Sequence, residues 1–316
     1  MRHLVLLVVD LARSSALRLL RTVSVAVLLL GLPGAAHAQP AKLKLGIYAP
    51  SVEFGSATAR LAYVQALGKA IEQSTGLRVE AQSYASLATL RKEGVDFAIV
   101  DGLCYATNLG WRLLANAAIG GATSRPWALH AGVGNMQSLR GKKLSFIMTG
   151  CNDAGFIDNA MLDSEVDPAF FSARIGKPDL AAAVAEVAAT RTAQAVFAPA
   201  GAAKGLTKLF DTGNVPNPAF VDVSGKLPAA TVDKVAAAVI GYGGAGAISG
   251  WTRPSREAYA SLAGRLGRVV KKGILAAPEP VRLDARDVLI DPPTIRESAL
   301  VGLRHHFVRP PGERLE

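Results

Sequence analysis

The sequence predicts an α/β fold organised as two lobes. The first observation behind this prediction is the alternation of strand-like and helix-like segments between residues 42 and 100. The second is that strand-like segments of similar sequence recur about a hundred residues further along the chain. The third is that alanine-rich helical segments fill the intervals between the later strands. Together these observations favour two α/β lobes of matching organisation.

The first lobe begins with five segments that alternate between the two patterns. Strands are predicted at 42–49, 77–81 and 95–100, and helices at 58–75 and 86–92. The first helix keeps its large apolar residues on one face, and Gly76 follows it where a helix C-cap belongs. The segment 95–100 is continuously apolar, which is typical of a parallel strand buried on both faces.

The second lobe repeats this order. Lys143–Met148 resembles the segment that begins at Lys44, at an offset of 99 residues, and Ala193–Ala198 resembles Val95–Val100 at an offset of 98. Short apolar strands can resemble one another by chance, but the matched spacing favours two related lobes. Further helices are predicted at 180–189, 231–240 and 256–272. Repeated prolines after residue 277 interrupt any longer element.

The N-terminal 38 residues have the three parts of a cleavable export signal. Four arginines precede the apolar run 23–32, and an Ala-x-Ala sequence ends at Ala38. The apolar run is shorter than the roughly 20 residues that a membrane-spanning helix needs. We therefore predict an exported chain cleaved after Ala38, with an uncleaved membrane anchor as the alternative.

The charge and composition of the chain argue against one class of function, nucleic-acid binding. Half of the residues are hydrophobic, and the export segment carries four arginines and one aspartate, so +7 of the net charge of +10 lies beyond it. The lysines and arginines are scattered and form no stripe interleaved with aromatic residues. We therefore predict no nucleic-acid partner.

Several short segments follow one another in an order and spacing found in a known family. They are Leu43–Ile47, Gly76–Tyr84, Gly94–Ala98, Tyr105, Ser138–Lys143, Gly155, Asp167–Phe171 and Pro216–Leu227. On these segments, residues 43–245 resemble the periplasmic substrate-binding proteins of ABC transporters, of the phosphonate- and phosphite-binding type. The resemblance implies the type II periplasmic-binding fold, in which each lobe has a mixed, mostly parallel sheet flanked by helices and a ligand cleft lies between the lobes.

The resemblance also implies how the chain divides. In that family the chain crosses between the lobes twice, which places hinges near 126–133 and 216–223. The expected segments are a signal peptide at 1–38, a first lobe at 42–127, a second lobe at 128–220, a return to the first lobe at 221–300 and a tail at 301–316.

The ligand-binding residues that the resemblance implies come from both lobes. They are Tyr48, Tyr84, Asp101 and Tyr105 from the first lobe, and Thr149, Cys151, Asn152 and Asp153 from the second. Tyr105 best matches the ligand-side tyrosine of the family. A tyrosine hydroxyl on an apolar wall can orient a polar ligand, although each tyrosine could equally pack with its hydroxyl in water.

The chain departs from the family in the turn before Gly155, where Asn152, Asp153 and Ala154 stand at the family's Ser/Thr positions. A carboxylate there would occupy the anion site and repel a dianion, unless Asp153 is simply an N-cap. The expected ligand is a small polar solute, either a phosphonate-like anion or, given Asp153, a neutral or amine-bearing compound, which fits Asp101 and Asp153 better. Gln194 also replaces an expected aspartate, as in a divergent member.

Two cysteines follow predicted strand ends that face the cleft, Cys104 in the first lobe and Cys151 in the second. In an oxidising compartment such a pair tends to form a disulfide, which would hold the cleft shut. The alternatives are two free thiols, or a thiol pair that binds a soft metal such as Cu(I). No metal-binding motif accompanies the pair, and we predict no metal and no cofactor.

Other motifs do not indicate catalysis. Gly241–Gly246 matches a dinucleotide-binding pattern, but it follows a helical stretch rather than a strand. No nucleophile–base pair is visible, and His130, His305 and His306 have no motif around them. We therefore predict a monomeric, non-enzymatic periplasmic protein that binds a small polar solute for an inner-membrane ABC permease. The alternatives are a sensor or adaptor with the same fold and, with less support, an exported enzyme.

Overall fold

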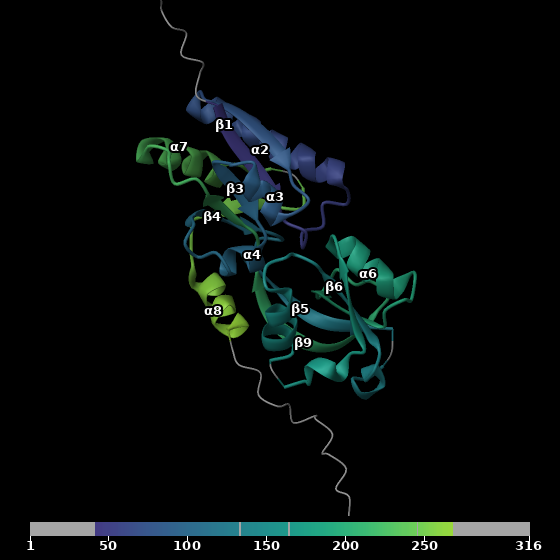
Figure 1. The fold of residues 1–316 in the computed structure, drawn as a ribbon. Helices are drawn as coiled ribbons and strands as arrows, with labels where there is room; N and C mark the ends of the chain where they lie inside the picture. Colours follow the sequence, from purple (N-terminus) through teal and green to yellow (C-terminus); the bar gives the residue numbers. More distant parts are fainter. Residues whose placement is uncertain (1–41, 133, 164, 245, 268–316) are drawn as a thin grey trace, which may run out of the picture. The chain divides into compact units, whose positions relative to one another are not determined.

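The computed structural model describes residues 42–132, 134–163, 165–244 and 246–267. The predicted signal peptide, the predicted tail at 301–316 and the end of the predicted last helix lie outside these ranges. Figure 1 shows the chain coloured along its sequence. Among the described residues, no helix is both long and apolar enough to cross a bilayer.

The first lobe combines the beginning and the end of the described chain. Its elements are β1 (Lys42–Tyr48), α2 (Ala57–Thr75), β2 (Arg78–Ser83), α3 (Leu87–Lys92), β3 (Phe97–Val100), α4 (Gly102–Ala106), β4 (Arg112–Ala118), β10 (Ala219–Asp222), α7 (Ala229–Ile240), β11 (Gly250–Thr252) and α8 (Glu257–Leu266). Its six-stranded sheet has the order β11-β4-β10-β3-β1-β2. The strands β3, β1 and β2 are parallel, and β10 runs antiparallel to β3 and β4.

The second lobe is one continuous stretch of chain. Its elements are β5 (Ser124–Ala131), η1 (Gln137–Leu139), β6 (Lys143–Ile147), α5 (Asp153–Gly155), η2 (Phe156–Met161), η3 (Pro168–Phe170), β7 (Ala173–Lys177), α6 (Leu180–Ala188), β8 (Ala195–Pro199) and β9 (Thr207–Pro216). Its five-stranded sheet has the order β7-β6-β8-β5-β9. The predicted α/β fold with two mixed sheets is therefore confirmed.

The internal repeat read from the sequence is present in the strand pairing. β1 lies between the parallel strands β3 and β2, and β6 lies between the parallel strands β8 and β7. The register agrees as well, because Leu45 pairs with Phe97 in the first lobe and Leu144 pairs with Ala195 in the second. These partners are related by the offsets of 99 and 98 residues.

The replacement of an aspartate by Gln194 has a simple structural meaning. In the first lobe the backbone N–H of Lys44 donates to the Asp96 carboxylate at 2.9 Å. In the second lobe the N–H of Lys143 donates to Gln194 Oε1 at 3.1 Å. A neutral amide oxygen thus satisfies the same backbone donor at the start of the central strand.

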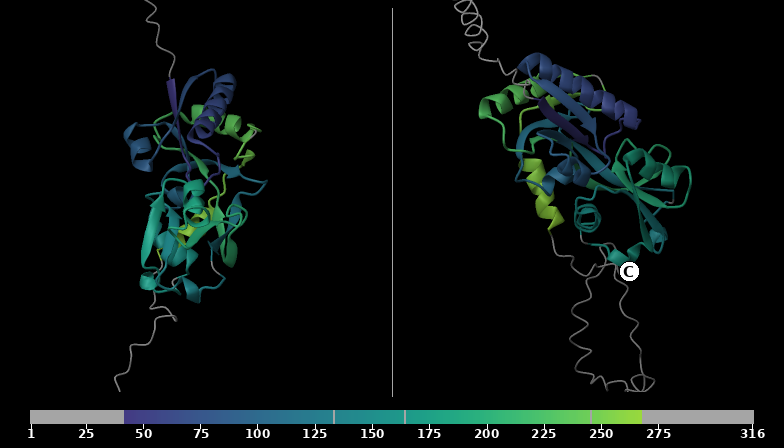
Figure 2. Two further views of the ribbon diagram at one scale, coloured as in Figure 1. Left: turned by 90° about the vertical axis from the view of Figure 1, so that its right-hand side faces the viewer. Right: turned by 45° about the horizontal axis from the view of Figure 1, so that its top comes forward.

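The first sheet has a helical layer on each face, as the two views in Figure 2 show. On one face α2 and α7 bury their apolar residues in a cluster with β1 and β3, with Val64 and Leu67 of α2 completely buried. Ser56 caps the N-terminus of α2. Gly76, at φ 72°, ends the helix, as the sequence predicts. On the other face a second apolar cluster includes residues of α3, α4 and α8 and continues into the second lobe.

The chain changes sheets between β4 and β5 and returns between β9 and β10. The two connections are held together, because Arg125 Nε donates to Asn217 Oδ1 at 2.9 Å and Asn217 Nδ2 donates to the Ala122 carbonyl at 2.7 Å. The sequence-based limits after residues 127 and 220 fall within β5 and β10. The resemblance implies a hinge near Pro126, but in the structure Pro126 lies within β5. β8 ends opposite Trp127, so the N–H that proline lacks is not needed for pairing with β8.

The second sheet buries an unpartnered histidine. His130 on β5 is 3% exposed, and neither ring nitrogen has a hydrogen-bond partner among the described residues. Burial lowers the pKa of His130 and nearby Lys208 lowers it further, while Asp211 opposes both. The folded state therefore binds a proton less readily than the unfolded state.

We expect this histidine to make the protein less stable in mild acid. Stability that depends on neutral His130 is fully present above pH 6.5 and is lost as the pH falls below that value, because the unfolded state then takes up the proton. Between pH 7.5 and 5.5 the free energy of unfolding, measured by urea titration, should fall by up to about 1 kcal/mol more in the wild type than in His130→Leu. Equal losses in both proteins would contradict this assignment.

Candidate functional site

A small cavity lies between the lobes, near the carboxyl ends of their central strands. It is lined by Ser51, Asp101, Leu103, Trp127, Phe146, Ile147, Thr149, Phe156, Ile157, Phe197 and Val215. Its volume is about 10 Å³, which is about enough for one water molecule. This cavity therefore has no space for an organic solute in this conformation.

Aromatic side chains form much of the cavity wall. Trp127 on β5 and Phe156 at the start of η2 meet edge to face, with ring centroids 5.5 Å apart and an interplanar angle of 90°. Phe146 from β6 and Phe197 from β8 complete the aromatic part of the wall. All four residues come from the second lobe, and only Phe146 and Phe197 lie in strands predicted from the sequence.

One carboxylate faces this largely apolar wall. Asp101 ends β3 and caps α4; its Oδ1 accepts from the N–H of Leu103 and its Oδ2 from the N–H of Ser51, both at 3.1 Å. Burial raises the pKa of Asp101, and these hydrogen bonds, with the charge of Arg125, offset the rise only in part. A cation placed beside this carboxylate would favour its ionised form.

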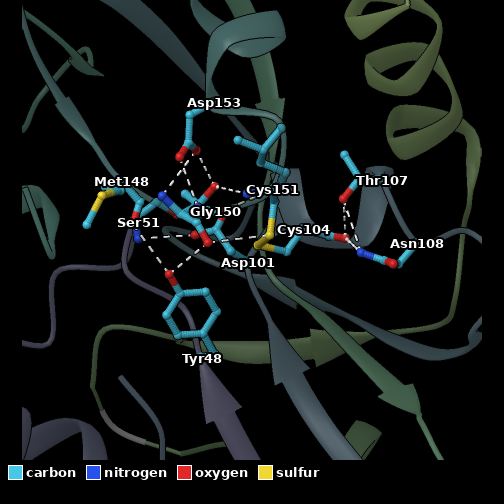
Figure 3. Close-up of a disulfide and its surroundings, with 12 residues drawn as sticks. Tyr48, Ser51, Asp101, Cys104, Thr107, Asn108, Met148, Gly150, Cys151 and Asp153 are labelled. Carbon is cyan, nitrogen blue, oxygen red and sulfur yellow. Dashed lines mark hydrogen bonds between the residues drawn. A yellow bond between two sulfur atoms is a disulfide. The ribbon is translucent and has the colours of Figure 1, made fainter. Parts of the chain in front are cut away.

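Tyr48 joins the two lobes beside the cavity. Its hydroxyl donates to the Thr149 carbonyl at 2.9 Å, across the interface between β1 and the turn after β6 (Figure 3). Burial raises the pKa of Tyr48, and the carboxylates of Asp101 and Asp153 raise it further. The tyrosine therefore stays protonated and acts as a hydrogen-bond donor between the lobes.

The turn that precedes α5 is folded around the Asp153 carboxylate. Asp153 Oδ1 accepts from Thr149 N at 3.1 Å and from Thr149 Oγ1 at 2.5 Å, and Oδ2 accepts from Gly150 N at 2.9 Å. Asn152, with φ 64°, is the N-cap and accepts from Gly155 N. The alternative that Asp153 is an N-cap is therefore wrong: its carboxylate instead occupies the donors that could bind an external anion.

Cys104 and Cys151 form a disulfide, with an S–S distance of 2.09 Å. Of the three states that the sequence leaves open, the structure has this one. Cys104 lies in α4 of the first lobe and Cys151 in the turn of the second, so the bond crosses between the lobes close to Asp101 and Gly150 (Figure 3). Among the described residues, no cluster of three or more His, Cys, Asp or Glu side chains could hold a metal ion.

The predicted ligand residues are not all brought together. Asp101 and Thr149 line the cavity, whereas Tyr48, Cys151 and Asp153 hold its edge. Asn152 is exposed, and Tyr84 packs over Gly46. Tyr105 is fully buried; its ring packs edge-on against Tyr259 at 4.7 Å and its hydroxyl donates to the Trp111 carbonyl.

The sequence reasoning missed Ser51, Arg125 and the aromatic wall. Ser51 and Arg125 meet where Arg125 Nη2 donates to the Ser51 carbonyl at 3.1 Å. Trp127 lies within the expected hinge at 126–133, and a large aromatic residue at a hinge beside a cleft is the signal that could have found it.

No protein-family model matches the chain, and no curated protein matches it. Solved structures do. A binding-protein component of an ABC phosphonate transporter from Pseudomonas aeruginosa is 14% identical, with a TM-score of 0.54 and coverage of 68% of this chain and 82% of that one. PhnD1 from Prochlorococcus marinus in complex with methylphosphonate is 10% identical, with a TM-score of 0.53 and coverage of 71% and 97%. A Xanthomonas citri protein bound to ATP is 11% identical, with a TM-score of 0.53 and coverage of 71% and 96%.

These similarities establish the fold. The chain has the two-lobed type II periplasmic-binding-protein fold, as the resemblance of its sequence implied. The ligands differ among these structures, so what this chain binds has to be argued from its own cavity.

Proposed function

We propose that this chain is a periplasmic solute-binding protein that captures a small organic cation between its lobes for an ABC permease. The observation that carries the proposal is the buried carboxylate of Asp101 in a cavity whose other walls are mainly aromatic and aliphatic. The fold it shares with binding components of ABC transporters supports the solute-binding role, and the N-terminal signal supports export.

The charges around the cavity favour a cation over an anion. Asp101 lines the cavity, and Asp153 already occupies the backbone and hydroxyl donors of its turn. A phosphonate dianion would meet two carboxylates, and the Thr149 and Gly150 donors of that turn are already bound to one of them. An ammonium group would instead have a buried counter-ion.

The aromatic wall favours a cation with an apolar surface. Aromatic faces attract ammonium groups through their quadrupole, most strongly when water is excluded. Trp127 and Phe156 offer such surfaces within the same cavity as Asp101. The class of ligand that combines both features is a small tertiary or quaternary ammonium compound.

A thermal-shift series tests the ligand class directly. Tetramethylammonium, methylphosphonate and inorganic phosphate are added separately to the protein, with and without a thiol reductant. At about 100 times its Kd a ligand stabilises the folded state by about 2.7 kcal/mol. We expect tetramethylammonium alone to raise the melting temperature in at least one redox state. A rise with methylphosphonate and none with tetramethylammonium would overturn the proposal.

A sensor or adaptor with the same fold is the second candidate. It is favoured by the disulfide between the lobes, because a transport protein has to open and close in every cycle. Deleting the gene and measuring uptake of the bound solute separates the two roles. Lost uptake supports transport, and unchanged uptake supports sensing.

A further inference from the structure

The interlobe disulfide lies next to residues that line the cavity. Cys104 follows Asp101 by three residues, and Cys151 follows Thr149 by two. Asp101 and Thr149 line the cavity from opposite lobes. The Cα atoms of the cysteines are 5.0 Å apart, and a disulfide keeps such atoms within about 7 Å of each other. While the bond is intact, the two cavity walls next to it cannot separate.

The polar contacts between the lobes beside the cavity are reversible. Tyr48 Oη donates to the Thr149 carbonyl at 2.9 Å, Arg125 Nη2 donates to the Ser51 carbonyl at 3.1 Å, and Leu180 N donates to the Pro50 carbonyl at 3.0 Å. Hydrogen bonds of this kind can exchange for bonds with water when the lobes move apart. The disulfide is covalent and cannot be replaced by bonds with water. At this edge it is therefore the contact that decides whether the lobes can open.

Contacts at α8 also join the lobes. The C-terminal end of α8 meets the second lobe, where Asn159 Nδ2 donates to the Leu266 carbonyl at 2.9 Å and Arg265 Nη2 donates to the Thr212 carbonyl at 3.0 Å. These contacts are non-covalent. If they and the buried aromatic side chains were enough to keep the lobes closed, breaking the disulfide would leave the cavity closed.

We infer that the Cys104–Cys151 disulfide is a redox lock on the cleft, so that a solute enters only after the bond is reduced. The class of solute that enters rests on the proposed function. The opening of the cleft on reduction does not depend on it. The volume of about 10 Å³ in the disulfide-bonded state is the observation behind it, since it admits one water and no ammonium compound.

The reaction is thiol–disulfide exchange with an exported dithiol. A thiolate of the dithiol attacks Cys151 Sγ, because Cys151 is the less buried residue of the pair, at 5% exposed against 0% for Cys104. Cys104 leaves as a thiolate and takes up a proton. The second thiol of the reductant then resolves the mixed disulfide, which releases Cys151 as a thiol. Two electrons and two protons pass to this chain, and the dithiol becomes a disulfide.

The opening is tested without any ligand. Acrylamide quenching of tryptophan fluorescence is measured on the oxidised protein, on the protein reduced with dithiothreitol, and on Cys104→Ser/Cys151→Ser. Because the chain has only two cysteines, a thiol count that rises from zero to two verifies reduction. We expect stronger quenching in the reduced protein and in the double variant. Trp127→Phe should lose this difference, because Trp111 and Trp251 do not line the cavity.

Equal quenching in the oxidised protein, the fully reduced protein and the double variant would overturn the lock. Titration with tetramethylammonium adds the second arm. We expect the oxidised protein to bind at least about tenfold more weakly than the double variant, because its open state is rarely populated. Equal affinity in both would also overturn the lock. Opening on reduction with no binding in either form would support the lock and contradict the proposed ligand class.

Discussion

Cys104→Ala/Cys151→Ala is expected to lower the free energy of unfolding by about 4 kcal/mol. The disulfide closes a loop with a sequence separation of 47 residues, and a cross-link of that span removes about this much conformational entropy from the unfolded chain. The value follows from urea unfolding monitored by circular dichroism. The double variant should still fold, because each lobe keeps its own sheet and the first lobe keeps the cluster beneath α2 and α7.

The matched control is the same measurement in dithiothreitol. Reductant should destabilise the wild type by a similar amount and leave the double variant unchanged. A loss below about 1 kcal/mol in both comparisons would show that the bond contributes little and would weaken its assignment as the main link between the lobes.

Asp153→Ala is expected to destabilise the protein by about 2–3 kcal/mol. The carboxylate accepts from two backbone N–H groups and one hydroxyl in the turn that carries Cys151, and hydrogen bonds to a charged group are each worth about 1.5–3 kcal/mol. Water compensates part of the loss, since Gly150 is exposed. Chemical denaturation gives the difference.

Asp153→Asn should lose less than Asp153→Ala, because one acceptor oxygen remains. Asp211→Ala removes an exposed carboxylate that pairs with Lys208 and should change stability by no more than about 0.5 kcal/mol. If Asp153→Ala were as mild as Asp211→Ala, the carboxylate would not be what holds the turn, and the argument against an anionic ligand would lose its basis.

The sequence predicts the lobes well because their determinants are local. A continuous apolar run such as 95–100 determines a buried strand from its own residues. Gly76 likewise determines the end of the helix directly before it. The repeat that relates Lys44 to Lys143 in the sequence corresponds to the same strand register in both lobes of the structure. The strand that contains Pro126 was harder to predict, because its tolerance depends on where the neighbouring strand β8 ends.

The candidate site was only partly predictable because it depends on which side chains meet across the lobes. Asp101 and Thr149 could be predicted, since polar residues after strand ends are typical of this cleft. Tyr105 could not be assigned from the sequence, because its neighbour Tyr259 is far along the chain. Trp127 and Phe156 lie about 30 residues apart in the sequence, and only the fold of the second lobe brings their rings into contact at the cavity wall.

Isothermal titration of the reduced protein with tetramethylammonium tests the central claim most directly, when the wild type is compared with Asp101→Asn and Asp211→Asn. Asp101→Asn removes the buried charge and keeps one acceptor oxygen, which serves one of the Ser51 and Leu103 amides that bind the two oxygens of Asp101. Removing one partner of a buried charge pair costs about 2–5 kcal/mol of binding free energy, which weakens binding by about 30-fold or more. We predict this loss for Asp101→Asn and unchanged affinity for Asp211→Asn. Equal affinity in all three proteins would contradict an interlobe cation site.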